Sequence, residues 1–117
     1  MPIEERVVGD IVVLTVTGEI RLDTGGDVVL RDKVRSLMHQ GRCHLLIDLA
    51  QVSYVDSAGL DELVSSYVTS NNAGGSLRLV HVTKRLQDVL TIAKLVTVFD
   101  TDDTEAAALA SFSSACV

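Results

Sequence analysis

The sequence predicts a single α/β domain with a mixed sheet of about five strands and helices packed on it. Apolar runs of strand length alternate with segments of helical period along the 117 residues, in the order β-β-α-β-α-β-α-β-α. The first two strands follow each other directly, so we expect them to be antiparallel. Each later strand–helix–strand unit requires parallel neighbours. One domain, residues 1–117, accommodates all of these elements.

The chain opens with a predicted β-hairpin. Residues 3–8 and 11–17 are rich in β-branched side chains, and the Gly9-Asp10 pair between them is typical of a two-residue turn. The second run is apolar on both faces, so we place it inside the sheet and end it at Gly18. The polar, glycine-containing segment that follows is the first loop that could have a functional role.

A helix is expected next, with Asp27 as its N-cap and Gly41 as its C-terminal stop. Its buried stripe is formed by apolar side chains at helical spacing, namely Leu30, Val34, Leu37 and Met38.

Residues 44–68 are the most informative stretch. The apolar run 45–49 predicts a strand covered on both faces, and a short polar joint separates it from a helix over 58–72. The buried face of that helix is predicted to contain Leu60, Leu63, Val64, Tyr67 and Val68. Its polar face is predicted to contain Asp61, Glu62, Ser65, Ser66 and Thr69.

The last third of the chain supplies two more strands and two more helices. Strands are expected at 77–82 and 96–99. Thr83 is the predicted N-cap of the third helix, whose inward side chains are Leu86, Val89 and Leu90. Asp102 is the predicted cap of the final helix, with Glu105 as its capping-box partner. That helix is expected to contain Leu109 and Phe112, and the tail after it to fray.

Composition restricts the possible partners. The formal net charge is −6, and the longest basic run, Lys84-Arg85, is too short to favour nucleic acid or an anionic membrane surface. The N-terminus does not resemble a signal peptide, and no apolar run has the length of a membrane span. The two cysteines do not make a disulfide framework. We expect Cys43 to pack as a small apolar side chain, Cys116 to lie in the tail, and the compartment to be the cytoplasm.

Ser57 is the main candidate for function, because it lies where a strand meets the positively polarised start of a helix. Two interpretations of the residues alone stay open. Ser57 or Asp56 could simply cap the helix. Alternatively, the Ser57 hydroxyl is phosphorylated, which would add about −1.5 to −2 charges beside free backbone N–H groups. The carboxylates of Asp56, Asp61 and Glu62 would make such a surface strongly negative.

Other chemistries fit less well. A nucleophile elbow requires G-x-S-x-G, and Val55 stands where the first glycine should be. Of the three histidines only His81 is expected to share the rim with Ser57, so a serine hydrolase is a distant hypothesis. The acidic group at 100–103 is typical of a turn and a helix cap, and no spacing typical of a metal site is present. We expect no catalytic residue, metal or cofactor.

The segment VSYVDSAGL at 52–60 resembles the D-S-[STA]-G motif of anti-sigma factor antagonists, a family of STAS domains. The resemblance covers nearly the whole chain, since three further segments are similar to family segments in the same order. These are GEI at 18–20, GGSLRLVHVTKRLQDVL at 74–90 and LVTVFDTDDTEAAA at 95–108.

The resemblance implies a cytoplasmic bacterial regulator that switches partners. The unmodified protein would bind an anti-sigma factor that is also a serine/threonine kinase with a histidine-kinase-like ATPase fold, which frees the sigma factor. Phosphorylation of Ser57 would break that complex, and a PP2C-type phosphatase would restore it. The residues implied to flank the site or contact the partner are Asp56, Ala58, Gly59, Leu60, Asp61, Glu62 and Asp23.

The chain departs from the family pattern at one place. Arg21 occupies a position that is commonly acidic, and the loop containing it is about two residues longer than usual, so Asp23 is the candidate substitute. An alternative function keeps the fold without the switch: a STAS scaffold or ligand-binding subunit of a transporter or signalling assembly.

Overall fold

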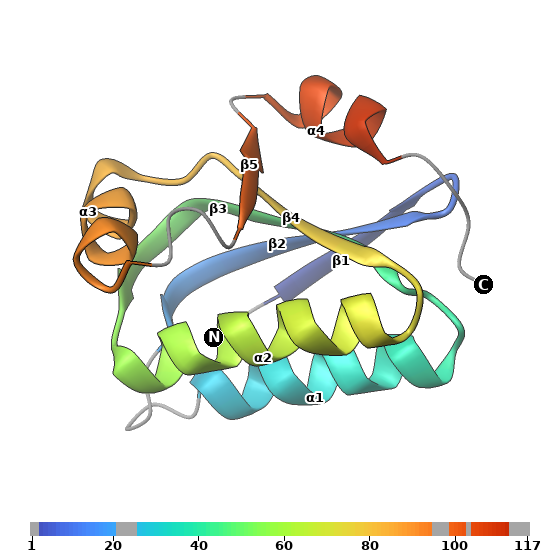
Figure 1. Cartoon of the computed structure of the whole chain (residues 1–117), viewed down its shortest axis with the longest axis horizontal. Helices are drawn as coiled ribbons and strands as arrows, with labels where there is room; N and C mark the ends of the chain where they lie inside the picture. Colours follow the sequence, from blue (N-terminus) through green and yellow to red (C-terminus); the bar gives the residue numbers. More distant parts are fainter. Residues whose placement is uncertain (1–2, 21–25, 95–98, 103, 113–117) are drawn as a thin grey trace.

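The computed structural model describes residues 3–20, 26–94, 99–102 and 104–112. The described elements follow the predicted order of strands and helices (Figure 1). They are β1 (Ile3–Val8), β2 (Ile11–Ile20), α1 (Gly26–His39), β3 (His44–Val55), α2 (Ser57–Asn72), β4 (Ser76–Val80), α3 (Lys84–Ile92), β5 (Asp100–Asp102) and α4 (Glu105–Ser111).

The five strands form one mixed sheet whose spatial order, β1-β2-β3-β4-β5, equals their order in the chain. β1 and β2 are antiparallel, and the other neighbouring pairs are parallel. The crossovers through α1 and α2 advance in the same direction along the sheet, and right-handed crossovers of this kind place their helices on the same face. Figure 1 shows α1 and α2 side by side on that face, α4 on the opposite face, and α3 at the end of the sheet where α2 begins.

The core has two parts, one on each face of the sheet. The larger part lies under α1 and α2, and its fully buried members include Leu14, Ile47, Leu63 and Leu79. The smaller part lies under α4 and contains Val13, Leu46, Val80 and Ala108. Burial on both faces explains why β2 and β3 have nearly continuous apolar sequences.

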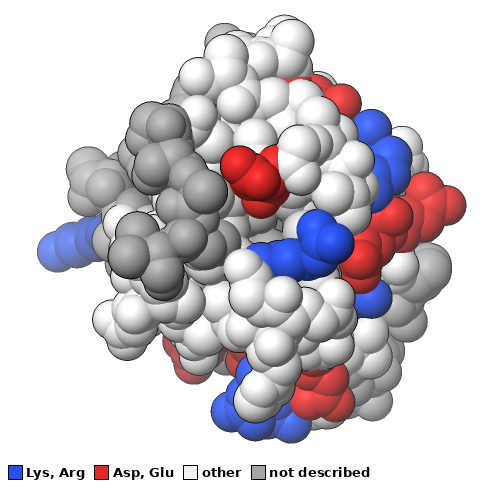
Figure 2. Space-filling model, turned by 90° about the vertical axis from the view of Figure 1, so that its right-hand side faces the viewer, with Lys and Arg blue, Asp and Glu red and all other residues white. Residues whose placement is uncertain are grey.

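Charged side chains at the sheet end opposite to α3 are mixed in sign. Figure 2 shows basic and acidic residues interspersed on this view of the described residues, with uncharged side chains covering much of it. On the α4 face, the Arg6 guanidinium donates a hydrogen bond to the Glu105 carboxylate, which raises the pKa of Arg6. Among the described helices, none is both long enough and apolar enough for a membrane span.

The central strands are longer than predicted. β2 continues past Gly18, which has a φ of +98° at an irregularity in the β2–β3 register, and ends at Ile20. β3 runs without a polar joint to Val55, because this extension of β2 pairs with it as far as Ile20↔Val55. β4 is shorter than predicted and ends at Val80.

Of the N-caps predicted for α1, α3 and α4, two are wrong and one is confirmed. The Thr83 hydroxyl accepts a hydrogen bond from the Leu86 N–H at 3.2 Å, as expected for the N-cap of α3. Asp27 is not a cap, because α1 already begins at Gly26. The cap of α4 is Thr104, since Asp102 lies in β5 and accepts a hydrogen bond from Arg78.

The last strand is also displaced from its predicted position. β5 occupies 100–102, whereas the prediction placed a strand at 96–99. Phe99 is buried, but residues 96–98 lie outside the described residues. The predicted final helix ends at Ser111, so Phe112 is its C-cap. The tail at 113–117 lies outside the described residues as well.

The faces of α2 match the prediction only in part. Leu60 and Leu63 are buried, but Val68, predicted to be buried, is 47% exposed. Ser66, predicted on the polar face, is buried instead, as is Ser70. Small serine side chains allow a helix to approach its neighbours closely, which an amphipathicity pattern does not detect.

Cys43 lies just before β3 and is buried, as expected. Its sulfur is in a disulfide. The prediction that Cys43 packs simply as a small apolar side chain is therefore wrong. Cys116 lies outside the described residues.

Candidate functional site

Asp56 connects the end of β3 to the start of α2. It has an extended backbone and is the N-cap of the helix, with its carboxylate accepting a hydrogen bond from the Gly59 N–H at 2.8 Å. Its own N–H donates to the Ile20 carbonyl at 3.2 Å, and its carbonyl accepts from the Leu60 N–H at 2.9 Å. Asp56 thus fixes the first turn of α2 relative to β2.

Replacing Asp56 with alanine is expected to lower the free energy of unfolding by about 1 kcal/mol, because the Gly59 N–H loses its acceptor. Urea denaturation of the variant measures this change. Asp61→Ala is the control, since Asp61 is an exposed carboxylate on the same helix. An equal loss in both variants would show that the cap contributes nothing specific.

Ser57 is the first residue of α2 and its side chain is exposed. Because Asp56 is the cap, the Ser57 hydroxyl is not needed for that purpose. Within the described part of the chain, no hydrogen bond engages this hydroxyl. The first N–H groups of a helix lack intrahelical acceptors and carry partial positive charge. An accessible hydroxyl therefore lies next to a favourable environment for an added anion.

Gly59 is needed for close packing at this junction. A Cβ at this position would lie 2.3 Å from the Ile20 carbonyl oxygen and 3.0 Å from a methyl carbon of Val55. These distances leave no room for any side chain. The glycine lets the first turn of α2 lie directly on the end of β2.

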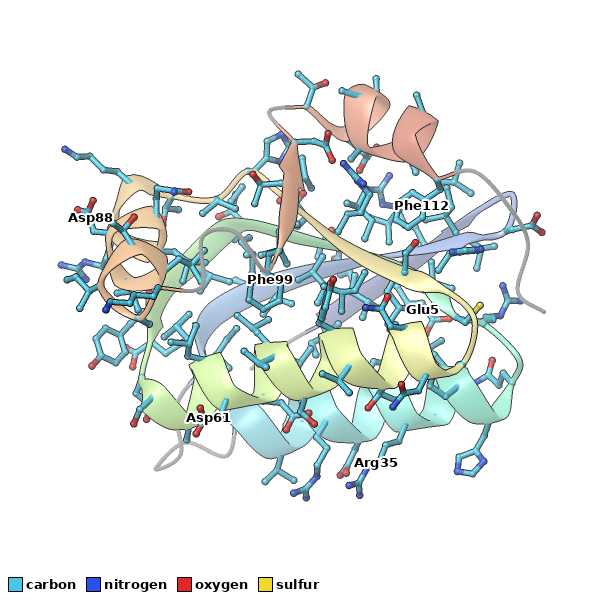
Figure 3. The ribbon with its side chains drawn as sticks, in the orientation of Figure 1. Glu5, Arg35, Asp61, Asp88, Phe99 and Phe112 are labelled. Atoms are coloured by element: carbon cyan, nitrogen blue, oxygen red, sulfur yellow. The ribbon has the colours of Figure 1, made fainter. Side chains whose placement is uncertain are left out.

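The other predicted contact residues differ in accessibility. Asp61 is exposed on the first turns of α2 (Figure 3), whereas Gly59 and Leu60 are buried. Ala58 and Glu62 are partly buried. The Glu62 carboxylate accepts a hydrogen bond from the Ser66 hydroxyl at 3.5 Å.

Asp23 and Arg21, in the loop that departs from the family pattern, lie outside the described residues. A role for Asp23 in partner contact therefore stays a prediction.

An apolar groove next to Ser57 was not predicted from the sequence. It has a volume of about 300 Å³ and lies between the end of β3, the start of α2 and the end of α3. Its lining residues are Tyr54, Val55, Asp56, Ser57, Leu60, Val89, Ile92 and Ala93. Of the groove residues on α3, only Val89 had been singled out from the sequence, as a side chain expected to face inward. Figure 1 shows α3 at the same end of the molecule as the start of α2.

The predicted proximity of His81 to Ser57 is wrong. β4 ends at Val80, opposite Asp48, whereas β3 extends seven residues further, from Asp48 to Val55. At about 3.3 Å per residue, His81 lies roughly 20 Å back along the sheet from that end. Its Nδ1 lies 3.1 Å from the Asp48 carboxylate instead. Within the described residues no group of three His, Cys, Asp or Glu side chains could hold a metal.

The fold is thus a small α/β domain with a mixed sheet, an N-capped central helix and an exposed serine at its start. The model of the STAS domain family matches residues 2–108. The chain belongs to this family. It is 37% identical over 87 residues to the anti-sigma-B factor antagonist of Bacillus subtilis strain 168, covering 74% of this chain and 77% of that protein. It therefore belongs among the anti-sigma factor antagonists of the STAS family.

Solved structures share the fold. A proposed anti-sigma factor antagonist from Thermotoga maritima superposes with a TM-score of 0.87 at 21% identity, covering 94% of this chain and 93% of that one. The anti-sigma factor antagonist SpoIIAA in its unphosphorylated form superposes with a TM-score of 0.72 at 18% identity, covering 93% of this chain and 96% of that one. The structure of Bacillus SpoIIAA is also known in the phosphorylated form. A sulfate transporter family protein from Wolinella succinogenes superposes with a TM-score of 0.70 at 16% identity, covering 90% of this chain and 86% of that one.

Proposed function

We propose that this chain is a cytoplasmic bacterial anti-sigma factor antagonist that is switched by phosphorylation of Ser57. The unmodified form binds an anti-sigma factor that is also a serine/threonine kinase with a histidine-kinase-like ATPase fold, and this releases the sigma factor. A PP2C-type phosphatase reverses the modification. The chain itself is a binding module and not an enzyme. The observation that supports this proposal most directly is the exposed Ser57 hydroxyl, which Asp56 leaves free of any capping role.

The switch is electrostatic. A phosphate on Ser57 adds about −1.5 to −2 charges at the start of α2, where backbone N–H groups favour it. The nearby carboxylates of Asp56 and Asp61 make the same surface strongly negative. A partner that covers Ser57 must then desolvate the phosphate, which opposes binding without any change of fold.

Phosphorylation by the anti-sigma factor kinases of the source organism tests the proposal. Each purified kinase is incubated with this chain and ATP, and intact and tandem mass spectrometry locate the phosphate. We expect one kinase to add a single phosphate to the wild type at Ser57 and none to Ser57→Ala. Ser65→Ala is the matched control, because Ser65 is an exposed serine on the same helix. Normal phosphorylation of Ser57→Ala would contradict the assignment.

The likeness to the sulfate transporter family protein favours one alternative, a STAS subunit that binds constitutively in a transporter or signalling assembly. Under this alternative no kinase of the panel modifies the chain. The same assay therefore separates the two functions.

A further inference from the structure

The end of the sheet where β3 begins, opposite to Ser57, is closed by contacts around Cys43 and His44. Cys43 is buried and its sulfur is in a disulfide. The ring of His44, which is buried as well, lies edge-on to the ring of Phe112, with 5.7 Å between the centroids. Phe112 is the C-cap of α4, and Figure 3 shows it on the side of the molecule away from α3. The end of α4 therefore lies on the residue next to Cys43.

The start of β4 holds Cys43 from the other side. The Ser76 N–H donates to the Cys43 carbonyl at 3.1 Å, and the Ser76 hydroxyl lies 3.2 Å from Nδ1 of His44. A Cβ on Gly75 would lie 2.1 Å from the Cys43 carbonyl oxygen, so only glycine allows this approach. Because Cys43 is only 2% exposed, its sulfur is out of reach of a second copy of the chain. Its disulfide is therefore intramolecular.

The sequence offers one partner for this bond. Cys116 is the only other cysteine of the chain, and it follows Phe112 by four residues. Four residues of extended chain span about 14 Å. That length is sufficient to reach from a ring that contacts His44 to the sulfur of the preceding residue. The ring contact and the disulfide are separate observations, and both direct the C-terminal segment to the start of β3.

We propose that Cys43 and Cys116 form a redox-sensitive crosslink that fastens α4 and the C-terminal segment to the start of β3. Disulfides are rare in the cytosol, the compartment proposed above, and those that occur there are mostly redox-active. The crosslink is thus a second input to the protein, in addition to phosphorylation. It does not depend on the phosphorylation of Ser57.

The reaction is thiol–disulfide exchange. Closing the crosslink joins the two cysteine sulfurs and transfers two electrons and two protons to a small-molecule disulfide, which leaves as two thiols. Opening is the reverse process, in which a thiol reductant becomes a disulfide and the two cysteine thiols are restored. A mixed disulfide between one cysteine and the small thiol is the intermediate in both directions.

The crosslink acts on stability. α4 has seven residues, which is too short for a helix that is stable alone. It is held by the ion pair between Arg6 and Glu105 at its start, by buried Ala108, and by the contact of Phe112 with His44 at its end. A bond from Cys43 to Cys116 adds a covalent attachment and restricts the unfolded chain. The oxidised form is therefore the more stable one, while the surface around Ser57, at the far end of β3, is unchanged.

Thermal unfolding in glutathione buffers tests the proposal. The full chain is equilibrated with mixtures from fully oxidised glutathione to the mostly reduced ratio of a cytosol, and peptides are mapped without prior reduction. The oxidised chain should be a monomer with a peptide that joins Cys43 to Cys116. Its thermal midpoint should fall by about 10 °C in the mostly reduced buffer.

Cys116→Ser is the test variant, because it leaves the buried Cys43 in place. Its midpoint should equal that of the reduced wild type in every buffer. Ser114→Ala, in the same segment, is the control and should keep the full dependence on glutathione. The proposal is wrong if the wild-type midpoint is the same in all buffers, if the disulfide joins two copies, or if it stays closed in the mostly reduced buffer. None of these results would affect the kinase assay at Ser57.

Discussion

Replacing Gly59 with alanine is expected to lower the free energy of unfolding by about 2–3 kcal/mol. The added Cβ would lie 2.3 Å from the Ile20 carbonyl oxygen, a backbone atom that cannot rotate away. Alanine has the better helix propensity, worth about 1 kcal/mol, but this gain is smaller than the cost of overpacking. The first turn of α2 must move off β2, which also displaces Ser57.

Urea denaturation measures this effect as a fall of roughly 1–2 M in the urea concentration at the unfolding midpoint. Ser57→Ala, two positions earlier on the exposed surface, is the control and should change stability by less than about 0.5 kcal/mol. A Gly59→Ala variant as stable as the wild type would mean that α2 does not lie as closely on Ile20 as the structure shows.

Ser57→Asp is expected to weaken kinase binding by about ten- to one-hundredfold, because it places an uncompensated carboxylate in the surface that the partner covers. The same carboxylate lies at the start of α2, where it interacts favourably with the helix dipole and should leave stability unchanged or slightly increased. A loss of affinity is therefore expected without a loss of stability.

Two measurements on one preparation test these effects. Calorimetric titration with the kinase measures the affinity, and urea denaturation measures the stability. Ser65→Asp is the control, because it adds the same charge to an exposed position of α2 farther from the groove. If Ser57→Asp lost both affinity and stability, the weaker binding would come from misfolding and not from charge.

The order and type of the elements could be predicted because hydrophobic period distinguishes strands buried on both faces from helices with one buried stripe. Strand ends could not be predicted as well. The residues after Leu49 are polar enough to suggest a loop, yet they continue β3 because β2 extends beyond Gly18 and supplies hydrogen-bond partners as far as Ile20. Such an extension depends on a neighbouring strand and not on local sequence.

Helix caps show the same limit. The segment around Asp102 offers several capping side chains in succession. Thr104 caps α4 because the Asp102 carboxylate accepts hydrogen bonds from Arg78 on the neighbouring strand. Local sequence identified a side chain that can cap a helix, but it could not show that the Asp102 carboxylate is already bonded to Arg78.

The candidate site was predictable where it is continuous in sequence. Asp56, Ser57 and Gly59 are close together in the chain, and each occupies the junction that the pattern indicated. The groove was not predictable, because it joins residues at the β3–α2 junction to Val89 and Ile92 from a separate helix. The exposure of Ile92 depends on where α3 ends relative to α2, and periodicity does not determine that arrangement.

The affinity of the kinase for the unmodified chain and for the chain phosphorylated at Ser57 tests the central claim most directly. Calorimetry with the same kinase preparation should give at least about hundredfold weaker binding for the phosphorylated chain, since the added dianion must be desolvated at the interface. An NMR spectrum of the phosphorylated chain should show shifts confined to residues near the start of α2. Equal affinities for the two forms would contradict the account.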